Sequence, residues 1–600
     1  MRLRRESIVS ALVRGLRARI VVMHQVQSKE ASPHLFSDET LAAALDRIPG
    51  KRESEVRFLG FGAEEICFTY RQLYDEARRR AAHLSGLGLR KGDRLGLMMS
   101  EAHEFVMSFM GCVLGGVVPV PLSPPMTAKA GEHFLATTAR ILTNSGARAL
   151  LTTGSGRAFA ETILGQAPPA TALLQVETAF QGEPPTFEPP RLGAEDLCFL
   201  QYTSGSTTLP RGVMVTHGSL MANIAAFLGP AGLDVGPEDV GVSWLPLYHD
   251  MGLIGFILGP LIYVGPLVIL STSSFARDPR AWLRAIDKYR GTITFAPNFA
   301  FAQVMKRLRD QDLEKLDLRS LRVVGCGAEP IQAETLRSFA ARLAPTGFRG
   351  ETLLPSYGLA ESTLAVSLSR RGTPIRAEVF DLEALARGLA QPAAPGAARS
   401  IELVSCGFPI PEHDVAILDD DGRRLGERAV GEITVCGRSV AQGYYANPEA
   451  TETTWRDGRL HTGDLGFLAD GELFVCGRKK EIIIVRGANY YPQDIESLVR
   501  DLPGIKRGNV AAFGARRDGV ERLVVAAEAD PREGDALRQA IAARILESLG
   551  LEVGEVALVP VGALPRTTSG KLQRNKVRQL FEENALPSLD KSSDVSSGEE

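Results

Sequence analysis

Short apolar segments alternate with segments of helical periodicity over much of this 600-residue chain. The first clear helical segment repeats apolar residues at three- and four-residue spacing, at Leu73, Ala77, Ala81, Leu84 and Leu87. Strand-like apolar segments follow at residues 94–99, 149–152, 267–270, 292–295 and 321–325. Because strands that alternate with helices form parallel sheets covered on both faces, this order predicts an α/β fold with doubly wound sheets.

The chain is too long for a single hydrophobic core, so at least two domains are expected. We expect a large N-terminal domain over residues 35–476, with two doubly wound sheets and a β-rich subdomain over about 402–476. Asp-Gly turns at residues 421–422, 457–458 and 470–471 favour antiparallel strands in that subdomain. A small, mobile α+β C-terminal domain is expected over residues 477–587. The proline-rich segment 168–190 is interpreted as a surface excursion.

The two ends of the chain differ in character from the rest. Residues 1–34 form a basic extension with six arginines by residue 19, which is interpreted as disordered, as preceding a native start at Met23, or as an interfacial amphipathic helix. Residues 588–600 are polar and acidic and are expected to be a disordered tail. Residues 251–270 carry no charge, but their glycines and prolines favour a buried helix, a turn and a buried strand over a membrane span.

Composition favours a small-molecule enzyme. The 68 basic and 71 acidic residues nearly cancel, so nothing indicates nucleic acid or stable membrane insertion. The seven cysteines show no CxxC spacing, which argues against zinc sites and disulfides and favours free thiols in a reducing cytoplasm.

The segment 202–213 gathers five Ser/Thr hydroxyls, two glycines and the cation of Arg211. Hydroxyls, backbone N–H groups and a guanidinium are the donors that bind phosphate oxygens, so this segment predicts a polyphosphate-binding loop. An ordinary Ser/Thr-rich turn is the alternative. A Walker P-loop is excluded because Pro210 and Arg211 stand where that motif has glycine and lysine.

Five further segments place acids, cations or aromatics beside glycine turns: residues 243–252, 356–362, 461–465, 477–481 and 565–571. Each alone has a structural explanation. In this order, over about residues 35–585, they resemble the acyl-adenylate-forming (AMP-binding) superfamily.

The resemblance implies a role for each matching residue. The phosphate loop would hold ATP through Thr203, Ser204, Gly205, Ser206, Thr207 and Arg211. The nucleotide would also contact Gly327, Ala328, Glu329, Tyr357, Gly358, Asp464 and Arg478, with Tyr357 stacked on adenine and Asp464 on the ribose. The catalytic set would be Lys571, Glu361 and His249, with Glu361 binding Mg²⁺ and Lys480 at the hinge. Thr208 replaces the family's usual glycine and restricts the backbone there, and Arg211 replaces its usual lysine, which keeps the charge but changes its geometry.

Within the superfamily, segments 244–255, 296–301 and 327–331 resemble the corresponding sequence segments of fatty acyl-AMP ligases. About 44 residues separate Glu361 from Cys406. In fatty acyl-AMP ligases an insertion here, matching residues 370–400, impedes the domain rotation that completes a CoA site. A neutral surface loop is the alternative.

The resemblance therefore implies ATP-dependent activation of a medium- or long-chain fatty acid to acyl-AMP, with release of pyrophosphate. The acyl group would pass to the phosphopantetheine thiol of a separate acyl carrier protein or of a polyketide or peptide synthase carrier domain. Residues 252–270 with Phe299 and Phe301 would line the acyl tunnel, although core packing predicts the same residues. A fatty acyl-CoA synthetase and an inactive adenylate-binding regulatory protein remain alternatives.

Overall fold

The computed structural model describes residues 39–51, 53–60, 65–125, 132–168, 171–203, 210–397, 399–485, 488–517, 520–530, 532–566 and 572–589. The predicted N-terminal extension and nearly all of the predicted C-terminal tail lie outside these residues. So do Ser204, Gly205, Ser206, Thr207, Thr208 and Lys571. Within the described ranges every helix falls short of the length and apolarity that a bilayer crossing needs.

The largest sheet has the strand order β17-β14-β13-β12-β11-β9-β10-β1-β2. Neighbours from β13 to β1 are parallel, and the edges are antiparallel. Its strands are β1 (Glu55–Leu59), β2 (Glu65–Thr69), β9 (Gly241–Ser243), β10 (Leu267–Leu270), β11 (Ile293–Ala296), β12 (Val323–Cys326), β13 (Leu353–Gly358), β14 (Ala365–Leu368) and β17 (Phe408–Pro409). The parallel strands β10, β11 and β12 are buried at every position, because helices cover both faces of such a sheet.

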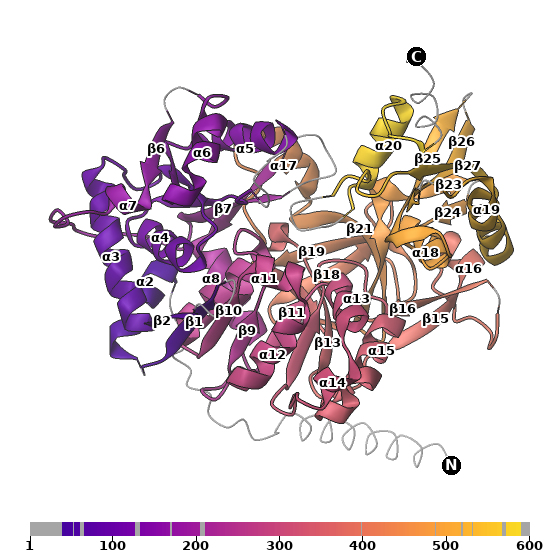
Figure 1. Ribbon diagram of the computed structural model, residues 1–600, viewed down its shortest axis with the longest axis horizontal. Helices are drawn as coiled ribbons and strands as arrows, with labels where there is room; N and C mark the ends of the chain where they lie inside the picture. The colour runs from indigo at the N-terminus through magenta and orange to yellow at the C-terminus, as the bar shows by residue number, and fades with distance from the viewer. Residues whose placement is uncertain are drawn as a thin grey trace, which may run out of the picture. The chain divides into compact units, whose positions relative to one another are not determined.

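Helices pack on this sheet and on one another. Helix α12 packs on β9 and β10, and α13 packs on α15 (Figure 1). The helices of this region are α8 (His217–Leu228), α9 (Asp250–Leu253), the π-helical turn η3 (Ile254–Leu258), α10 (Gly259–Tyr263), α11 (Thr272–Arg277), α12 (Arg280–Tyr289), α13 (Asn298–Arg307), α14 (Asp310–Leu313) and α15 (Ala333–Leu343). The uncharged segment 251–270 is therefore buried helix, turn and strand, as predicted.

A second parallel sheet has the order β4-β3-β5-β6. It contains β3 (Arg94–Met98), β4 (Val118–Pro121), β5 (Ala149–Thr152) and β6 (Ala172–Gln175), with α3 (Tyr70–Gly86), α4 (Ala102–Leu114), α5 (Glu132–Ser145) and α6 (Arg157–Leu164) between or before them. Strand β6 and the short helix α7 (Val176–Ala179) fall in the proline-rich segment, so the predicted surface excursion is partly wrong. Leu87, taken as part of the apolar stripe of α3, follows the helix and is 50% exposed.

Antiparallel strands follow, as the Asp-Gly turns predict. The sheet contains β18 (His413–Leu418), β19 (Gly431–Gly437), β20 (Trp455–Arg456), β21 (Arg459–Ala469) and β22 (Glu472–Arg478). Both residues of the turns Asp457-Gly458 and Asp470-Gly471 have positive φ, between 53° and 76°, which is the type I′ geometry that joins adjacent antiparallel strands. In the segment between Glu361 and Cys406, β14 is followed by β15 (Ala377–Asp381) paired with β16 (Ser400–Val404), with α16 (Leu382–Ala386) between them.

The remaining part of the chain is a mixed α/β unit. Its main sheet has the order β25-β26-β27 and packs against helices through a buried apolar cluster. Its elements are η7 (Lys479–Glu481), β23 (Ile483–Val485), β24 (Ala488–Tyr490), α18 (Pro492–Val499), β25 (Ile505–Arg517), β26 (Val520–Ala529), α19 (Asp535–Leu549), β27 (Val553–Val559) and α20 (Arg574–Glu582).

Candidate active site

The candidate site lies at the carboxyl edge of the largest sheet. Strands β9, β11, β12 and β13 are neighbours and parallel, so the loops that follow them meet at one edge, where open α/β sheets bind ligands. The segments that follow these strands carry His249, Phe299 at the start of α13, Gly327 and Glu361 in turn. One cavity of about 1920 Å³ is lined by the predicted site residues Thr203, His249, Gly327, Ala328, Glu329, Tyr357, Gly358, Glu361, Asp464 and Arg478.

The loop after β12 is held in a strained backbone conformation. Ala328 has φ 68°, which a residue with a side chain rarely adopts. A Cβ atom on Gly327 would lie 2.7 Å from Oγ of Ser356, so only glycine allows the loop to approach β13 this closely. Glu329 Oε1 accepts the backbone N–H of Phe299 at 2.5 Å and ties this loop to the start of α13. Strain of this kind often marks a ligand-binding loop.

Tyr357, Asp464 and Arg478 form one group, joined by a hydrogen bond and an ion pair. The hydroxyl of Tyr357 donates to Oδ2 of Asp464 at 2.7 Å, and Nε of Arg478 lies 3.3 Å from Oδ1. Asp464 and Arg478 are register partners in β21 and β22, which places their side chains next to each other. Burial raises the pKa of Tyr357 well above its usual value, and the charge of Asp464 raises the pKa of Arg478. The group presents a hydroxyl, a carboxylate and a guanidinium to the cavity.

Glu361 follows β13 and has a partner that sequence reasoning missed. The hydroxyl of Tyr444 donates to its Oε1 at 2.8 Å, and the Arg211 guanidinium lies 5.1 Å from the centre of the Tyr444 ring. Burial raises the pKa of Glu361, and the Tyr444 bond opposes that rise. Tyr444 reaches this place through an isolated bridge to Val213. In the sequence, Tyr444 is marked only by its neighbour Tyr445 after β19, and such a pair of aromatic residues is also found in ordinary turns.

The structure describes the two ends of the predicted phosphate loop, up to Thr203 and from Pro210 onward. Strands β7 (Leu197–Thr203) and β8 (Arg211–Thr216) are antiparallel, and Thr203 is the register partner of Arg211. The intervening predicted residues lie outside the described ranges. Arg211 does not line the cavity and instead lies over Tyr444. Its predicted contact with phosphate therefore rests on the sequence resemblance.

His249 and the two predicted lysines differ in their surroundings. Nδ1 of His249 lies 2.6 Å from Oδ1 of Asp250, and both residues line the cavity. Lys480 is exposed on η7 and does not line it, whereas the adjacent Glu481 does. Lys571 lies outside the described residues. Arg566 and Leu572, which flank residues 567–571 in the sequence and pair through an isolated bridge, both line the cavity.

The cavity continues into an apolar region. Its lining there includes Phe227, Leu228, Leu233, Phe256, Pro260, Phe295 and Phe299. Phe301 was expected in the tunnel wall but is fully buried against Trp282 and Phe339, at ring distances of 5.7 and 5.0 Å. That prediction is wrong, because Phe301 is a core residue.

A buried amide that the sequence did not single out braces the segment after Glu361. Asn223 on α8 donates to the carbonyl of Ala365 and to Oγ of Ser439, each at 2.9 Å, and accepts the N–H of Ala365 at 3.0 Å. Within this segment Thr363 has φ 68°. A lone asparagine on an apolar helix gives no sequence signal for such a role.

Comparisons with known proteins agree with this geometry. The family model for AMP-binding enzymes matches residues 48–445, and that for the AMP domain of Disco-interacting protein 2-like proteins matches residues 480–591. A Caulobacter vibrioides protein described provisionally as an acyl-CoA synthetase is 36% identical, covering 91% of this chain and 96% of its own. JamA of Moorena producens, a medium-chain-fatty-acid–[acyl-carrier-protein] ligase, is 33% identical over 88% and 92% of the two chains.

A solved structure from a study of fatty acyl-adenylate ligases of E. coli and L. pneumophila has a TM-score of 0.87 and 34% identity. The match covers 92% of this chain and 99% of the chain in the solved structure. The predicted mixed α/β fold and the predicted resemblance to adenylate-forming enzymes are thereby confirmed.

Proposed function

Because the chain belongs to the AMP-binding enzyme family, we propose that it activates a medium- or long-chain fatty acid as acyl-AMP and passes the acyl group to a carrier-protein thiol. One observation carries the proposal. The polar group of Tyr357, Asp464 and Arg478 and the carboxylate of Glu361 line the same cavity as a run of apolar side chains. Such a cavity can hold a nucleotide and an alkyl chain side by side.

The chemistry requires no protein nucleophile. An oxygen of the fatty acid carboxylate attacks the α-phosphorus of ATP, the bond to pyrophosphate breaks, and a mixed anhydride forms. A thiolate then attacks the acyl carbonyl carbon and expels AMP. The protein contributes alignment and charge stabilisation. Asp464 and Arg478 would hold the ribose and Tyr357 the adenine, and the loop at Gly327–Glu329 would also contact the nucleotide.

Glu361 is the proposed protein ligand to Mg²⁺. In the described part of the chain, no three His, Cys, Asp or Glu side chains gather to hold a metal ion. A single carboxylate suits magnesium, which usually binds one or two carboxylates together with waters and substrate phosphates. Bound there, the ion would neutralise phosphate charge.

Lys571 is the proposed cation at the reacting centre, on the strength of the sequence resemblance. We expect Lys571→Ala to abolish adenylate formation while ATP still binds. Removal of one electrostatic contact to a transition state typically costs on the order of 10²–10³ in rate. Near-normal pyrophosphate release by the variant would contradict this role.

Contacts of the segment 370–404 support carrier protein over CoA as the acceptor. The Arg399 guanidinium donates to the carbonyl of Leu549 at 2.8 Å, and α16 packs on β24. Leu382 packs against the apolar cluster of the C-terminal unit. Such contacts would restrain rotation of that unit. Fatty acyl-CoA synthesis, the alternative function, would need that rotation. The provisional description of the Caulobacter relative is the observation that favours the alternative.

We place the reaction in the cytoplasm. The seven cysteines all fall within the described ranges and are free thiols, which fits a reducing compartment.

One experiment tests the proposal. The enzyme is incubated with Mg-ATP and a labelled fatty acid, and then CoA or a holo acyl carrier protein is added. We expect acyl-AMP that survives CoA and is discharged by the carrier protein. Rapid thioester formation with CoA would support the acyl-CoA synthetase instead. Absence of pyrophosphate would support the inactive adenylate-binding protein.

A further inference from the structure

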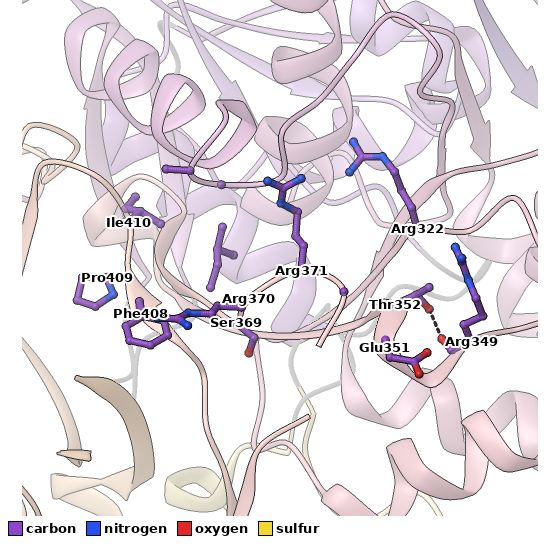
Figure 2. Close-up of a pocket in the computed structure, with 14 residues that line it drawn as sticks. Arg322, Arg349, Glu351, Thr352, Ser369, Arg370, Arg371, Phe408, Pro409 and Ile410 are labelled. Atoms are coloured by element: carbon purple, nitrogen blue, oxygen red, sulfur yellow. Dashed lines mark hydrogen bonds between the residues drawn. The ribbon is translucent and has the colours of Figure 1, made fainter. Parts of the chain in front are cut away.

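A second cavity, of about 1030 Å³, is rich in arginine. Arg322 precedes β12, Arg349 precedes the 3₁₀ turn Gly350–Thr352, and Arg370 and Arg371 follow β14. Figure 2 shows Arg322, Arg349 and Arg371 extending in the same direction, while Arg370 reaches Phe408. Among the described residues that line this cavity, Glu351 is the single acidic one. We call this cavity the arginine pocket.

Two of the four guanidinium groups have carboxylate partners. Arg322 is held by both oxygens of Asp239, each at 2.5 Å, and Arg371 lies 3.1 Å from Oδ2 of Asp234. Arg349 donates to the carbonyl of Leu321 at 3.3 Å, and Arg370 lies 4.5 Å from the centre of the Phe408 ring. Within the described ranges, neither of these two is within 4.0 Å of a carboxylate. The pocket therefore holds positive charge that an anion would balance, and guanidinium forks suit carboxylate and phosphate.

Apolar side chains line the pocket together with the arginines, Glu351, Thr352 and Ser369. Leu368, Phe408, Pro409 and Ile410 line it beside the arginines. A bare inorganic anion would leave this surface in contact with water. An organic anion with a carboxylate or phosphate at one end and an apolar body would cover both surfaces.

A thin wall separates the arginine pocket from the large cavity. Leu368 lines both cavities. Arg322 lines the arginine pocket, whereas its partner Asp239 lines the large cavity. Arg322 also donates to the carbonyl of Leu233, at 2.8 Å, and Leu233 belongs to the apolar lining of the large cavity. A ligand that draws on Arg322 would change the wall of the acyl region.

We propose that the arginine pocket is a binding site for an organic carboxylate or phosphate, and that Arg322 couples its occupancy to the acyl cavity. The coupling rests on the proposed function, whereas the binding does not. The anion has two possible sources. It arrives from solvent as a free phosphate ester, or it is the far-end carboxylate of an acyl substrate that passes the wall.

The first arm measures binding without catalysis. Phenyl phosphate is titrated by calorimetry into the full chain saturated with AMP. The pocket variant is Arg349→Gln/Arg370→Gln, and the control is Arg284→Gln/Arg319→Gln, two exposed arginines outside the pocket. We expect one saturable site, weakened at least tenfold in the pocket variant and less than twofold in the control. Arg349→Lys/Arg370→Lys, which keeps the charge, should bind with intermediate affinity, and melting temperatures identify any variant that misfolds.

The second arm identifies the source of the anion. Pyrophosphate release is compared for dodecanoate and dodecanedioate. A tenfold loss of relative activity on dodecanedioate, confined to the pocket variant, supports an acyl-chain carboxylate as the ligand. An unchanged ratio together with weakened phenyl phosphate binding supports a free ligand from solvent. Equal phenyl phosphate affinity in wild type and pocket variant, with an unchanged ratio, overturns the proposal. If the wild type releases no pyrophosphate, only the proposed function is contradicted, because calorimetry still measures phenyl phosphate binding to the arginine pocket.

Discussion

The carboxylate of Glu361 depends on a single hydroxyl partner among the described side chains. Burial raises its pKa, and the bond from Tyr444 lowers it. A carboxylate must be ionised to bind a metal ion. Because the Tyr444 bond favours the ionised form of Glu361, its contribution to the proposed metal binding grows as the pH falls.

Tyr444→Phe removes that bond and keeps the ring. The pKa of Glu361 should rise further, so the ionised form is lost at a higher pH. We expect the acid limb of the pH–rate profile for pyrophosphate release to move up by roughly one pH unit, equivalent to about 1.4 kcal/mol. Half-maximal activity should also need more Mg²⁺. Tyr445→Phe is the matched control. An acid limb that stays in place would show that Tyr444 has no effect on Glu361.

Asp464 is the charged acceptor of the Tyr357–Asp464–Arg478 group. Asp464→Asn keeps the size and an acceptor for Tyr357 but removes the charge. Because hydrogen bonds to charged groups are worth about 1.5–3 kcal/mol, KM for ATP should rise roughly 10- to 100-fold. KM for the fatty acid should change little. Asp457→Asn, in a turn of the same sheet, is the control, since asparagine tolerates its positive φ. A parallel rise in both KM values would contradict nucleotide binding by Asp464.

Some site residues could be predicted from the sequence and others could not. Tyr357, Glu361 and Asp464 stand beside glycine turns in recognisable segments. Tyr444 and Asn223 have no such setting, because their roles depend on contacts with residues 361 and 365, far away in the sequence. Phe301 was wrongly placed in the tunnel because periodicity does not tell a cavity wall from the core.

At the scale of elements, hydrophobic pattern predicted the parallel strands well. Strands β3, β5, β10 and β11 lie within one residue of the predicted segments, because a buried parallel strand must be apolar throughout. The pattern did not predict the π-helical turn η3 or the edge strand β6. Those depend on how neighbouring elements pack.

The pair β15–β16 with α16 is the element that bears on the acceptor. Arg399→Ala combined with Leu382→Ala removes its bond to Leu549 and its packing on the C-terminal apolar cluster. The C-terminal unit should then rotate more freely. We expect the ratio of acyl-CoA to acyl-carrier product, measured by mass spectrometry, to rise about fivefold, as a loss of about 1 kcal/mol implies.

Arg387→Ala is the control for this prediction, because Arg387 lies in the same segment with its side chain 67% exposed. An unchanged product ratio in the double variant would show that these contacts do not restrain the choice of acceptor. A rise in the control as well would indicate a general loosening of the segment.

At the scale of the whole molecule, the two proposed half-reactions need different arrangements of the C-terminal unit. In the proposed reaction, adenylation would need Lys571 at the cavity, and attack by the thiol would need Lys571 to leave it. Lys480, in η7, is the predicted hinge. Proline fixes φ near −65° and is tolerated in the first turn of a helix, where the backbone N–H lacks an intrahelical partner. Lys480→Pro should therefore fold and form acyl-AMP at a near-normal rate, but transfer to the carrier should fall at least tenfold. Single-turnover assays separate the two steps.

Lys480→Ala, which removes the same charge and leaves φ free, should transfer the acyl group to the carrier at the normal rate. Equal transfer by both variants would place the hinge elsewhere, and equal loss by both would assign the effect to the lysine charge.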